Sequence, residues 1–113
     1  MTELEKMKSN IPYDPSDNEL RDGRKNARRI FEEFNNSSYS DRKGRKALLK
    51  ELFGSTGENI YIEPYFKCDY GFNIHVGDNF FANFDCIFLD CAEIRIGKNA
   101  MLAPGVHIYT AYH

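Results

Sequence analysis

Apolar residues recur every six positions in the last third of this 113-residue chain. One series consists of Val76, Ala82, Phe88, Ile96, Leu102 and Ile108. A second series lies two positions earlier and consists of Ile74, Phe80, Cys86, Ile94, Ala100 and Val106. Hexapeptide repeats of this kind are typical of a parallel β-helix. The first series is therefore expected to point into one shared interior, with Cys86 of the second series also on an inward position.

The spacing also predicts how the coil closes. Three hexapeptides make one three-sided turn of about eighteen residues, and the longer step from Phe88 to Ile96 indicates a two-residue insertion at one corner. With that insertion, His75 is expected to align with Arg95 and, one further eighteen-residue coil later, with His113. The chain then holds about two coils, whereas a solenoid usually needs about three repeats to bury a continuous core.

Residues 1–55 show the pattern of a helical segment instead. Thr2 and Ser16 each precede a Glu by three positions, which is the spacing of an N-terminal capping box. A helical stripe follows the second box at Leu20, Ala27, Phe31 and Phe34. A second helix is expected from about Asp41 to Phe53, with Gly54 as its C-cap and with buried apolar residues at Ala47, Leu48, Leu49, Leu52 and Phe53.

The sequence thus predicts a mainly β fold with an α-helical N-terminal segment over residues 1–55. The start of a β-helix, incomplete at its C-terminal end, is expected over residues 56–113.

Charge and composition exclude several classes of partner. The formal net charge is −2, which argues against a general attraction to nucleic acid or to an anionic membrane. The basic residues between Arg21 and Arg29 are interrupted by acids and are expected to form a solvated face. The mean hydropathy is −0.58, no apolar run approaches a membrane span, and the N-terminus lacks the apolar core of a signal peptide. With three Cys expected as reduced thiols, a cytoplasmic location is predicted.

The histidines raise the question of a zinc site, because hexapeptide carbonic anhydrases bind zinc through three histidines and this chain has three. His107 and His113 are six positions apart, which places them on adjacent faces of the predicted coil. One chain alone does not bring that pair onto a tetrahedral ion, so no metal is predicted.

Four stretches carry a more specific pattern: YIEP at 61–64, CDYGFNI at 68–74, NFFANFD at 79–85 and MLAPGVHIYTA at 101–111. Together they resemble the maltose and galactoside O-acetyltransferase branch of the hexapeptide-repeat acyltransferases, whose fold is a left-handed parallel β-helix. The helical front end, including YDPSD at 13–17, is similar to the N-terminal segment of that branch. The resemblance covers nearly the whole chain.

The resemblance implies acetyl transfer from acetyl-CoA to a sugar hydroxyl, with sites between the subunits of a homotrimer. It assigns His113 as the general base and Asn83 as an active-site asparagine. An imidazole has the pKa needed to take a proton from a hydroxyl as it attacks the thioester. No covalent enzyme intermediate and no metal is then required.

On the acceptor side the resemblance implies four binding positions, for which this chain offers five candidate residues. Arg24 matches an arginine of the helical segment, and either Asp14 or Asp17 matches an aspartate there. Phe81 stands where some relatives have Tyr, and Asp90 matches an acid near the acceptor pocket. From the residues alone, Asp14 and Asp17 are turn and cap residues first, and Asn83 and Asp90 are polar corner residues.

Because relatives continue beyond position 113, the chain is expected to be a truncated fragment without turnover of its own. Two alternatives stay open. One is a non-catalytic assembly module that pairs through the edge of its last coil. The other is a hexapeptide acyltransferase with a different acceptor, such as an amino sugar, an oligosaccharide signal or an amino acid.

Overall fold

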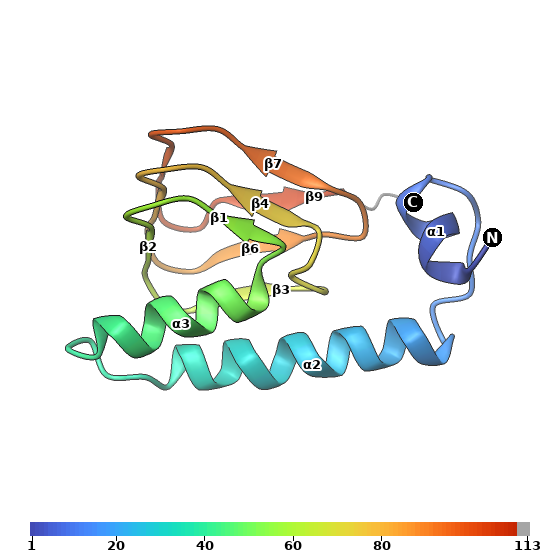
Figure 1. Ribbon diagram of the computed structural model, residues 1–113, viewed down its shortest axis with the longest axis horizontal. Helices are drawn as coiled ribbons and strands as arrows, with labels where there is room; N and C mark the ends of the chain where they lie inside the picture. The colour runs from blue at the N-terminus through green and yellow to red at the C-terminus, as the bar shows by residue number, and fades with distance from the viewer. Residues whose placement is uncertain (111–113) are drawn as a thin grey trace.

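The computed structural model describes residues 1–110, and its β part is a three-sided coil (Figure 1). Within those residues, short strands form three parallel sheets of three strands, in the orders β1-β4-β7, β2-β5-β8 and β3-β6-β9. The strands are β1 (Ser55–Thr56), β2 (Tyr61–Ile62), β3 (Phe66–Cys68), β4 (Ile74–Val76), β5 (Phe81–Ala82), β6 (Cys86–Leu89), β7 (Ile94–Ile96), β8 (Met101–Leu102) and β9 (His107–Tyr109).

Each coil contains twenty residues rather than eighteen. Ser55 pairs with His75 and His75 with Arg95, and the other two sheets keep the same offset. The alignment of His75 with Arg95 and the insertion after Phe88 are confirmed. The eighteen-residue length for the other coils is wrong, because the corner after β3 carries the same two additional residues as the corner after β6. The aligned position of His113 rested on that length, and His113 itself lies outside the described residues.

Stacking begins at Ser55, so each sheet holds three strands instead of the expected two coils. Both hexapeptide series point inward, as predicted. In the second coil they are almost fully buried, with Ala82, Cys86 and Phe88 at 0% exposure. In the last described coil Ile94 is also buried, whereas the other equivalent side chains pack against the same core but stay partly exposed.

Asparagines allow the sharp corner between the first and second sheets. Asn59, Asn79 and Asn99 recur at the twenty-residue offset and all have positive φ, between 58° and 63°. Asn tolerates this left-handed conformation better than most residues. The Asn79 side-chain amide also donates to Asn99 Oδ1 at 2.9 Å, which links successive coils.

Three helices precede the coil: α1 (Glu3–Lys8), α2 (Asn18–Asn35) and α3 (Arg42–Leu52). The capping box at Thr2 is confirmed. The one expected at Ser16 is wrong, since Asp17 caps α2 by accepting from the Glu19 amide. The C-cap of α3 is Phe53 and not Gly54.

Helices α2 and α3 pack side by side and cover the start of the coil (Figure 1). The predicted stripe of α2 is buried, as are Leu49, Leu52 and Phe53, whereas Ala47 is exposed. Gly54, just after α3, allows the chain to lie close to the backbone of Phe72, because a Cβ at position 54 would lie 2.3 Å from the Phe72 carbonyl oxygen. No helix in residues 1–110 is both long enough and apolar enough to span a bilayer.

Candidate functional site

The structure divides the predicted site residues into two groups. Arg24, Asp14, Asp17 and Asp90 lie where the start of α2 meets the corner that follows β3 and β6. Phe81 and Asn83 belong to β5 and to the next corner, on another side of the coil. His113 lies outside the described residues.

Arg24 is held in place by two hydrogen bonds. Its Nη1 donates to the Tyr70 hydroxyl at 2.8 Å, and its Nη2 donates to the Pro15 carbonyl oxygen at 2.7 Å. The guanidinium carbon also lies 5.9 Å from the centroid of the Tyr70 ring. Burial raises the pKa of Tyr70, and the Arg24 hydrogen bond opposes that rise. Arg24 therefore presents a fixed cation beside a neutral phenol.

The two candidate aspartates act locally as the sequence indicated. Asp14 Oδ1 accepts from the Ser16 amide at 2.9 Å and from the Ser16 hydroxyl at 2.7 Å. These bonds lower the pKa of the exposed Asp14 carboxyl. Asp17 Oδ2 accepts from the Glu19 amide at the start of α2. Both carboxylates flank Pro15, whose carbonyl anchors Arg24, so all three candidates share one region.

Asp90 is fully buried, and backbone amides surround its carboxylate. Oδ1 accepts from Asp69 and Tyr70 at 3.1 and 2.9 Å, and Oδ2 accepts from Gly71 and Asn73 at 2.8 and 3.3 Å. Burial raises the pKa of Asp90 to about 6, although these amide donors oppose the rise. Asp90 thus organises the corner that carries Tyr70, the partner of Arg24.

Beside this corner lies a chain of weaker contacts. The Tyr13 hydroxyl donates to Cys91 Sγ at 3.8 Å, and Cys91 Sγ donates to Asp69 Oδ2 at 3.4 Å. Burial, together with the charge of Asp69, raises the pKa of Cys91 to about 11. Because the thiolate is the reactive form, Cys91 is unsuited to act as a nucleophile near neutral pH.

Phe81 and Asn83 form the second group. The Phe81 ring stacks on Tyr61, with ring centroids 5.9 Å apart and planes 8° from parallel. Asn83 Oδ1 accepts from the amide of Phe84 at 2.9 Å. Both side chains remain partly exposed.

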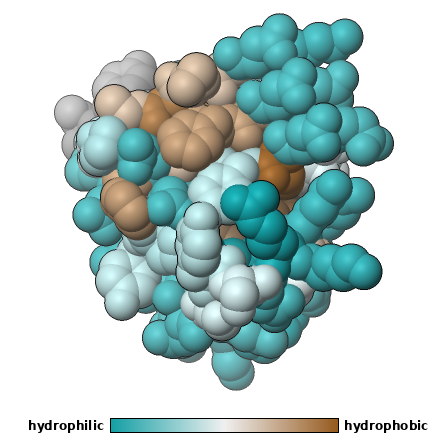
Figure 2. All heavy atoms as spheres, turned by 90° about the vertical axis from the view of Figure 1, so that its left-hand side faces the viewer, coloured by the Kyte–Doolittle hydropathy of each residue, from teal (hydrophilic) through white to brown (hydrophobic). Residues whose placement is uncertain are grey.

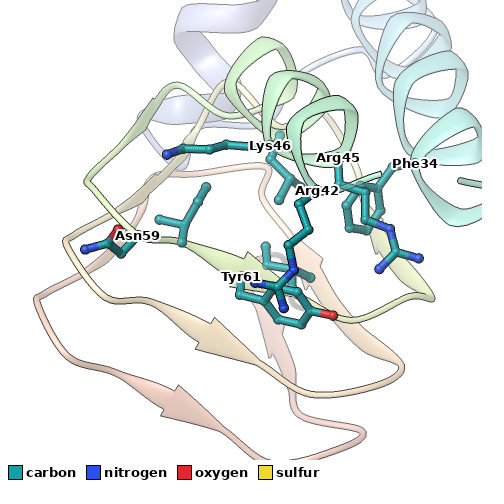
Figure 3. Close-up of a pocket in the computed structure, with 9 residues that line it drawn as sticks. Phe34, Arg42, Arg45, Lys46, Asn59 and Tyr61 are labelled. Atoms are coloured by element: carbon teal, nitrogen blue, oxygen red, sulfur yellow. The ribbon is translucent and has the colours of Figure 1, made fainter. Parts of the chain in front are cut away.

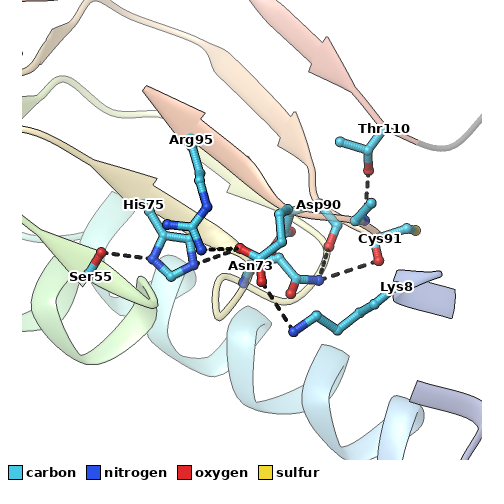
Figure 4. A network of polar contacts seen from close by, with 10 residues as sticks. Lys8, Ser55, Asn73, His75, Asp90, Cys91, Arg95 and Thr110 are labelled. Atoms are coloured by element: carbon cyan, nitrogen blue, oxygen red, sulfur yellow. Dashed lines mark hydrogen bonds and ion pairs between the residues drawn. The ribbon is translucent and has the colours of Figure 1, made fainter. Parts of the chain in front are cut away.

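Sequence reasoning missed a polar network on the β1-β4-β7 face (Figure 4). His75 bridges Ser55, at 2.7 Å from Nδ1, and Glu93, at 2.8 Å from Nε2. Lys8 of α1 contacts Glu93 Oε1 at 3.1 Å, and Arg95 Nη2 lies 3.6 Å from Glu93 Oε2, the oxygen that His75 contacts. The twenty-residue spacing of Ser55, His75 and Arg95 was the available signal. The network fastens α1 to the coil.

Across residues 1–110, no group of three or more His, Cys, Asp or Glu side chains is arranged to hold a metal ion. His107 instead contacts the Tyr109 hydroxyl at 2.8 Å through Nδ1.

The profile of the maltose acetyltransferase hexapeptide capping motif matches residues 6–57. The crystal structure of a maltose O-acetyltransferase from Clostridium difficile superposes on the whole chain with a TM-score of 0.98 and 51% identity. The chain is related to the maltose and galactoside O-acetyltransferases. The predicted family resemblance and the left-handed hexapeptide β-helix with N-terminal helices are thereby confirmed.

Other relatives agree. An acetyltransferase from Vibrio cholerae, solved in complex with acetyl-coenzyme A, matches all of this chain with a TM-score of 0.90 and 38% identity. The galactoside O-acetyltransferase of Escherichia coli is 40% identical over 74% of the chain. The present 113-residue chain spans only part of these proteins: 60% of the Clostridium difficile chain, 61% of the Vibrio cholerae chain and 41% of the Escherichia coli protein.

Proposed function

We propose that the chain supplies the helical segment and first coils of an acetyl-CoA-dependent O-acetyltransferase whose acceptor is a sugar hydroxyl. The observation that carries the proposal is the match of the entire chain, at 51% identity, to a maltose O-acetyltransferase. Acetyl-CoA is the expected co-substrate, because the matched Vibrio cholerae structure holds acetyl-coenzyme A and a matched galactoside acetyltransferase structure, with 34% identity to this chain, holds coenzyme A. A cytoplasmic protein without a resident metal fits this chemistry.

In the proposed mechanism, His113 takes the proton of the acceptor hydroxyl as the oxygen attacks the thioester carbonyl. The C–S bond then breaks, the acetyl group stays on the sugar oxygen, and coenzyme A leaves as the thiol with the proton returned from the imidazolium. An amide side chain such as that of Asn83 is suited to hold a reacting group by hydrogen bonds. On the acceptor side, the fixed guanidinium of Arg24 donates to sugar oxygens, with Asp14 or Asp17 accepting from sugar hydroxyls. Phe81 supplies an apolar surface for the ring, and Asp90 contributes by holding the corner beside Arg24.

We further propose that the site is completed between subunits of a homotrimer. The Arg24 group and Asn83 lie on different sides of one coil, so a neighbouring copy offers a way to join them. Large exposed apolar side chains, including Tyr65 at 57% and Phe84 at 49%, lie next to the Asn83 corner. On the side of the coil where β2 lies in Figure 1, apolar side chains form a patch amid hydrophilic ones (Figure 2), as is common for interaction surfaces.

The 113-residue chain alone is expected to show no turnover. Ile96, Leu102 and Ile108 face the interior but are only partly buried, whereas Val76, Ala82 and Phe88 one coil below are buried. Further coils would cover that end. A chimera in which the remaining coils of the Clostridium difficile enzyme follow residue 113 therefore provides the active test protein.

The chimera is assayed with acetyl-CoA and a panel of maltose, glucose, a galactoside and an amino sugar. We expect acetylation of a sugar hydroxyl and its loss in a His113→Ala variant. Activity that survives His113→Ala would contradict the general-base assignment. A folded, trimeric chimera without activity on any acceptor would favour the non-catalytic assembly module.

Mixing two inactive variants tests the shared site. If Arg24 and Asn83 act from neighbouring subunits, co-refolded Arg24→Ala and Asn83→Ala chains regain up to about one quarter of the sites. That fraction follows from random mixing, in which a site is intact only when both neighbours contribute their unaltered residue. No recovery in a mixed trimer would place both residues in one subunit's site.

A further inference from the structure

A cavity of about 280 Å³ lies between α3 and β2, away from the Arg24 region. Its floor is apolar and is made by buried side chains of Phe34, Leu49, Ile60 and Ile62. Its rim is polar and cationic. Arg42 reaches from α3 toward the ring of Tyr61, with Lys46 and Asn59 on one side of the cavity and Arg45 on the other (Figure 3).

Three cations from one face of α3 line this cavity. Arg42, Arg45 and Lys46 are spaced i, i+3 and i+4, which places them side by side on a helix. The lining residues include no carboxylate. Within residues 1–110, neither Arg42 nor Lys46 takes part in an ion pair. The guanidinium of Arg42 rests over Tyr61, with its carbon 5.0 Å from the ring centroid.

Arg45 is the most buried of the three. It is only 7% exposed, and its Nε and Nη2 donate to the hydroxyl and carbonyl oxygens of Ser37 at 2.9 and 3.2 Å. Its Nη1 is buried and finds no acceptor among the residues that the structure describes. A buried charged donor without a partner is unfavourable.

We propose that this cavity is a binding site for a small phosphate monoester. A phosphate dianion carries two negative charges, which suits the two accessible cations Arg42 and Lys46 better than the single charge of a carboxylate. The Arg42 guanidinium has a planar fork that matches phosphate oxygens. The apolar floor accommodates the carbon skeleton of the ester, and the volume, just below the usual range for ligand pockets, restricts the ligand to a small metabolite.

The site is distinct from the proposed acetyl-transfer residues. Phe34, on the cavity floor, is ten residues after Arg24 on α2, which corresponds to about 15 Å along a helix axis. Tyr61 nevertheless connects the two regions, because its ring stacks on Phe81. An anion bound in the cavity would draw the Arg42 guanidinium away from the Tyr61 ring. The stacking of Tyr61 on Phe81 would then change.

Calorimetric titration at constant ionic strength tests the proposal with phenyl phosphate, inorganic phosphate and acetate as probes. We expect saturable binding of both phosphates, with phenyl phosphate tighter, and acetate at least tenfold weaker. An Arg42→Gln/Lys46→Gln variant should lose at least tenfold in phenyl phosphate affinity. The matched Lys43→Gln/Lys50→Gln variant removes the same charge from exposed positions of α3 that do not line the cavity and should stay within twofold of wild type.

Several outcomes would overturn the proposal. These are an absence of saturable phosphate binding, an equal loss in the two double variants, and acetate binding as tightly as phosphate. Coenzyme A also carries phosphates, so a competition arm is included. Displacement of phenyl phosphate by coenzyme A but not by pantetheine would show that the cavity takes the coenzyme's phosphate and is no separate site. Thermal melting with and without phenyl phosphate checks that each variant is folded.

Discussion

Replacing Asp90 by alanine removes the acceptor that holds residues 69–73 in their corner conformation. Four backbone amides donate to its carboxylate, and three of these bonds are buried. At about 1 kcal/mol for each lost hydrogen bond, the variant should lose about 4 kcal/mol of unfolding free energy. That is a large share of the 5–15 kcal/mol typical of a small domain.

Urea denaturation followed by circular dichroism at pH 7.5 measures this loss. We expect the midpoint of Asp90→Ala to fall by roughly 2 M or more. An Asp90→Asn variant keeps one acceptor oxygen and removes the buried charge, so it should lose only about half as much. Asp22→Ala, at an exposed position of α2, serves as a control and should change the unfolding free energy by less than about 0.5 kcal/mol.

The reasoning would be refuted by an Asp90→Ala protein within about 1 kcal/mol of wild type. The corner would then hold without its acceptor, and Asp90 would be free for another role, such as direct contact with the acceptor sugar.

Three further outcomes are expected. Burial raises the folded-state pKa of Asp90 to about 6, so protonation of Asp90 stabilises the fold fully below about pH 4, and this stabilisation is lost as the pH rises to about 6. Urea denaturation across this range should show a fall in unfolding free energy with pH that Asp90→Asn lacks. The same pH dependence in both proteins would contradict the raised pKa. Asn79 has a φ of 58°, so Asn79→Ala should lower unfolding free energy by about 1–2 kcal/mol and Asn79→Gly by less, whereas equal melting temperatures would argue against backbone strain. In the active chimera, Arg24→Lys keeps the positive charge but loses one of the two hydrogen bonds that fix this side chain. The variant should raise the acceptor KM about tenfold and leave the acetyl-CoA KM unchanged. A change in the acetyl-CoA KM instead would indicate that Arg24 contacts the coenzyme.

The coil was predictable because its signal is local. In a strand of two or three residues, alternate side chains point inward, so both hexapeptide series can be read without tertiary information. The twenty-residue period was equally present in Asn59, Asn79 and Asn99 but does not follow from counting in sixes. The first coil fell within the β-helix predicted over residues 56–113 but was not counted as a separate coil, because its strands carry aromatic residues rather than the hexapeptide pattern.

The candidate site was less predictable, because its partners are distant in the sequence. Arg24 could be placed on a helical stripe, yet its partner Tyr70 is 46 positions away, and only the packing of α2 against the corner brings them together. Asp90 shows the same limit. An acid at a corner suggests an exposed side chain, and its burial depends on how the backbone of residues 69–73 turns its amides inward.

The two-residue insertions link these features. A corner with eight rather than six residues between inward positions has additional backbone, and its amides need an acceptor when they are turned inward. Asp90 supplies that acceptor from the equivalent corner of the next coil, twenty residues beyond Tyr70. The ordered corner then presents the Tyr70 hydroxyl to Arg24 and accommodates α2 closely enough that a Cβ at Gly23 would lie 3.0 Å from the Tyr70 ring. The departure from a regular hexapeptide coil is therefore what allows the helical segment to dock, and it is at this junction that the proposed acceptor residues gather.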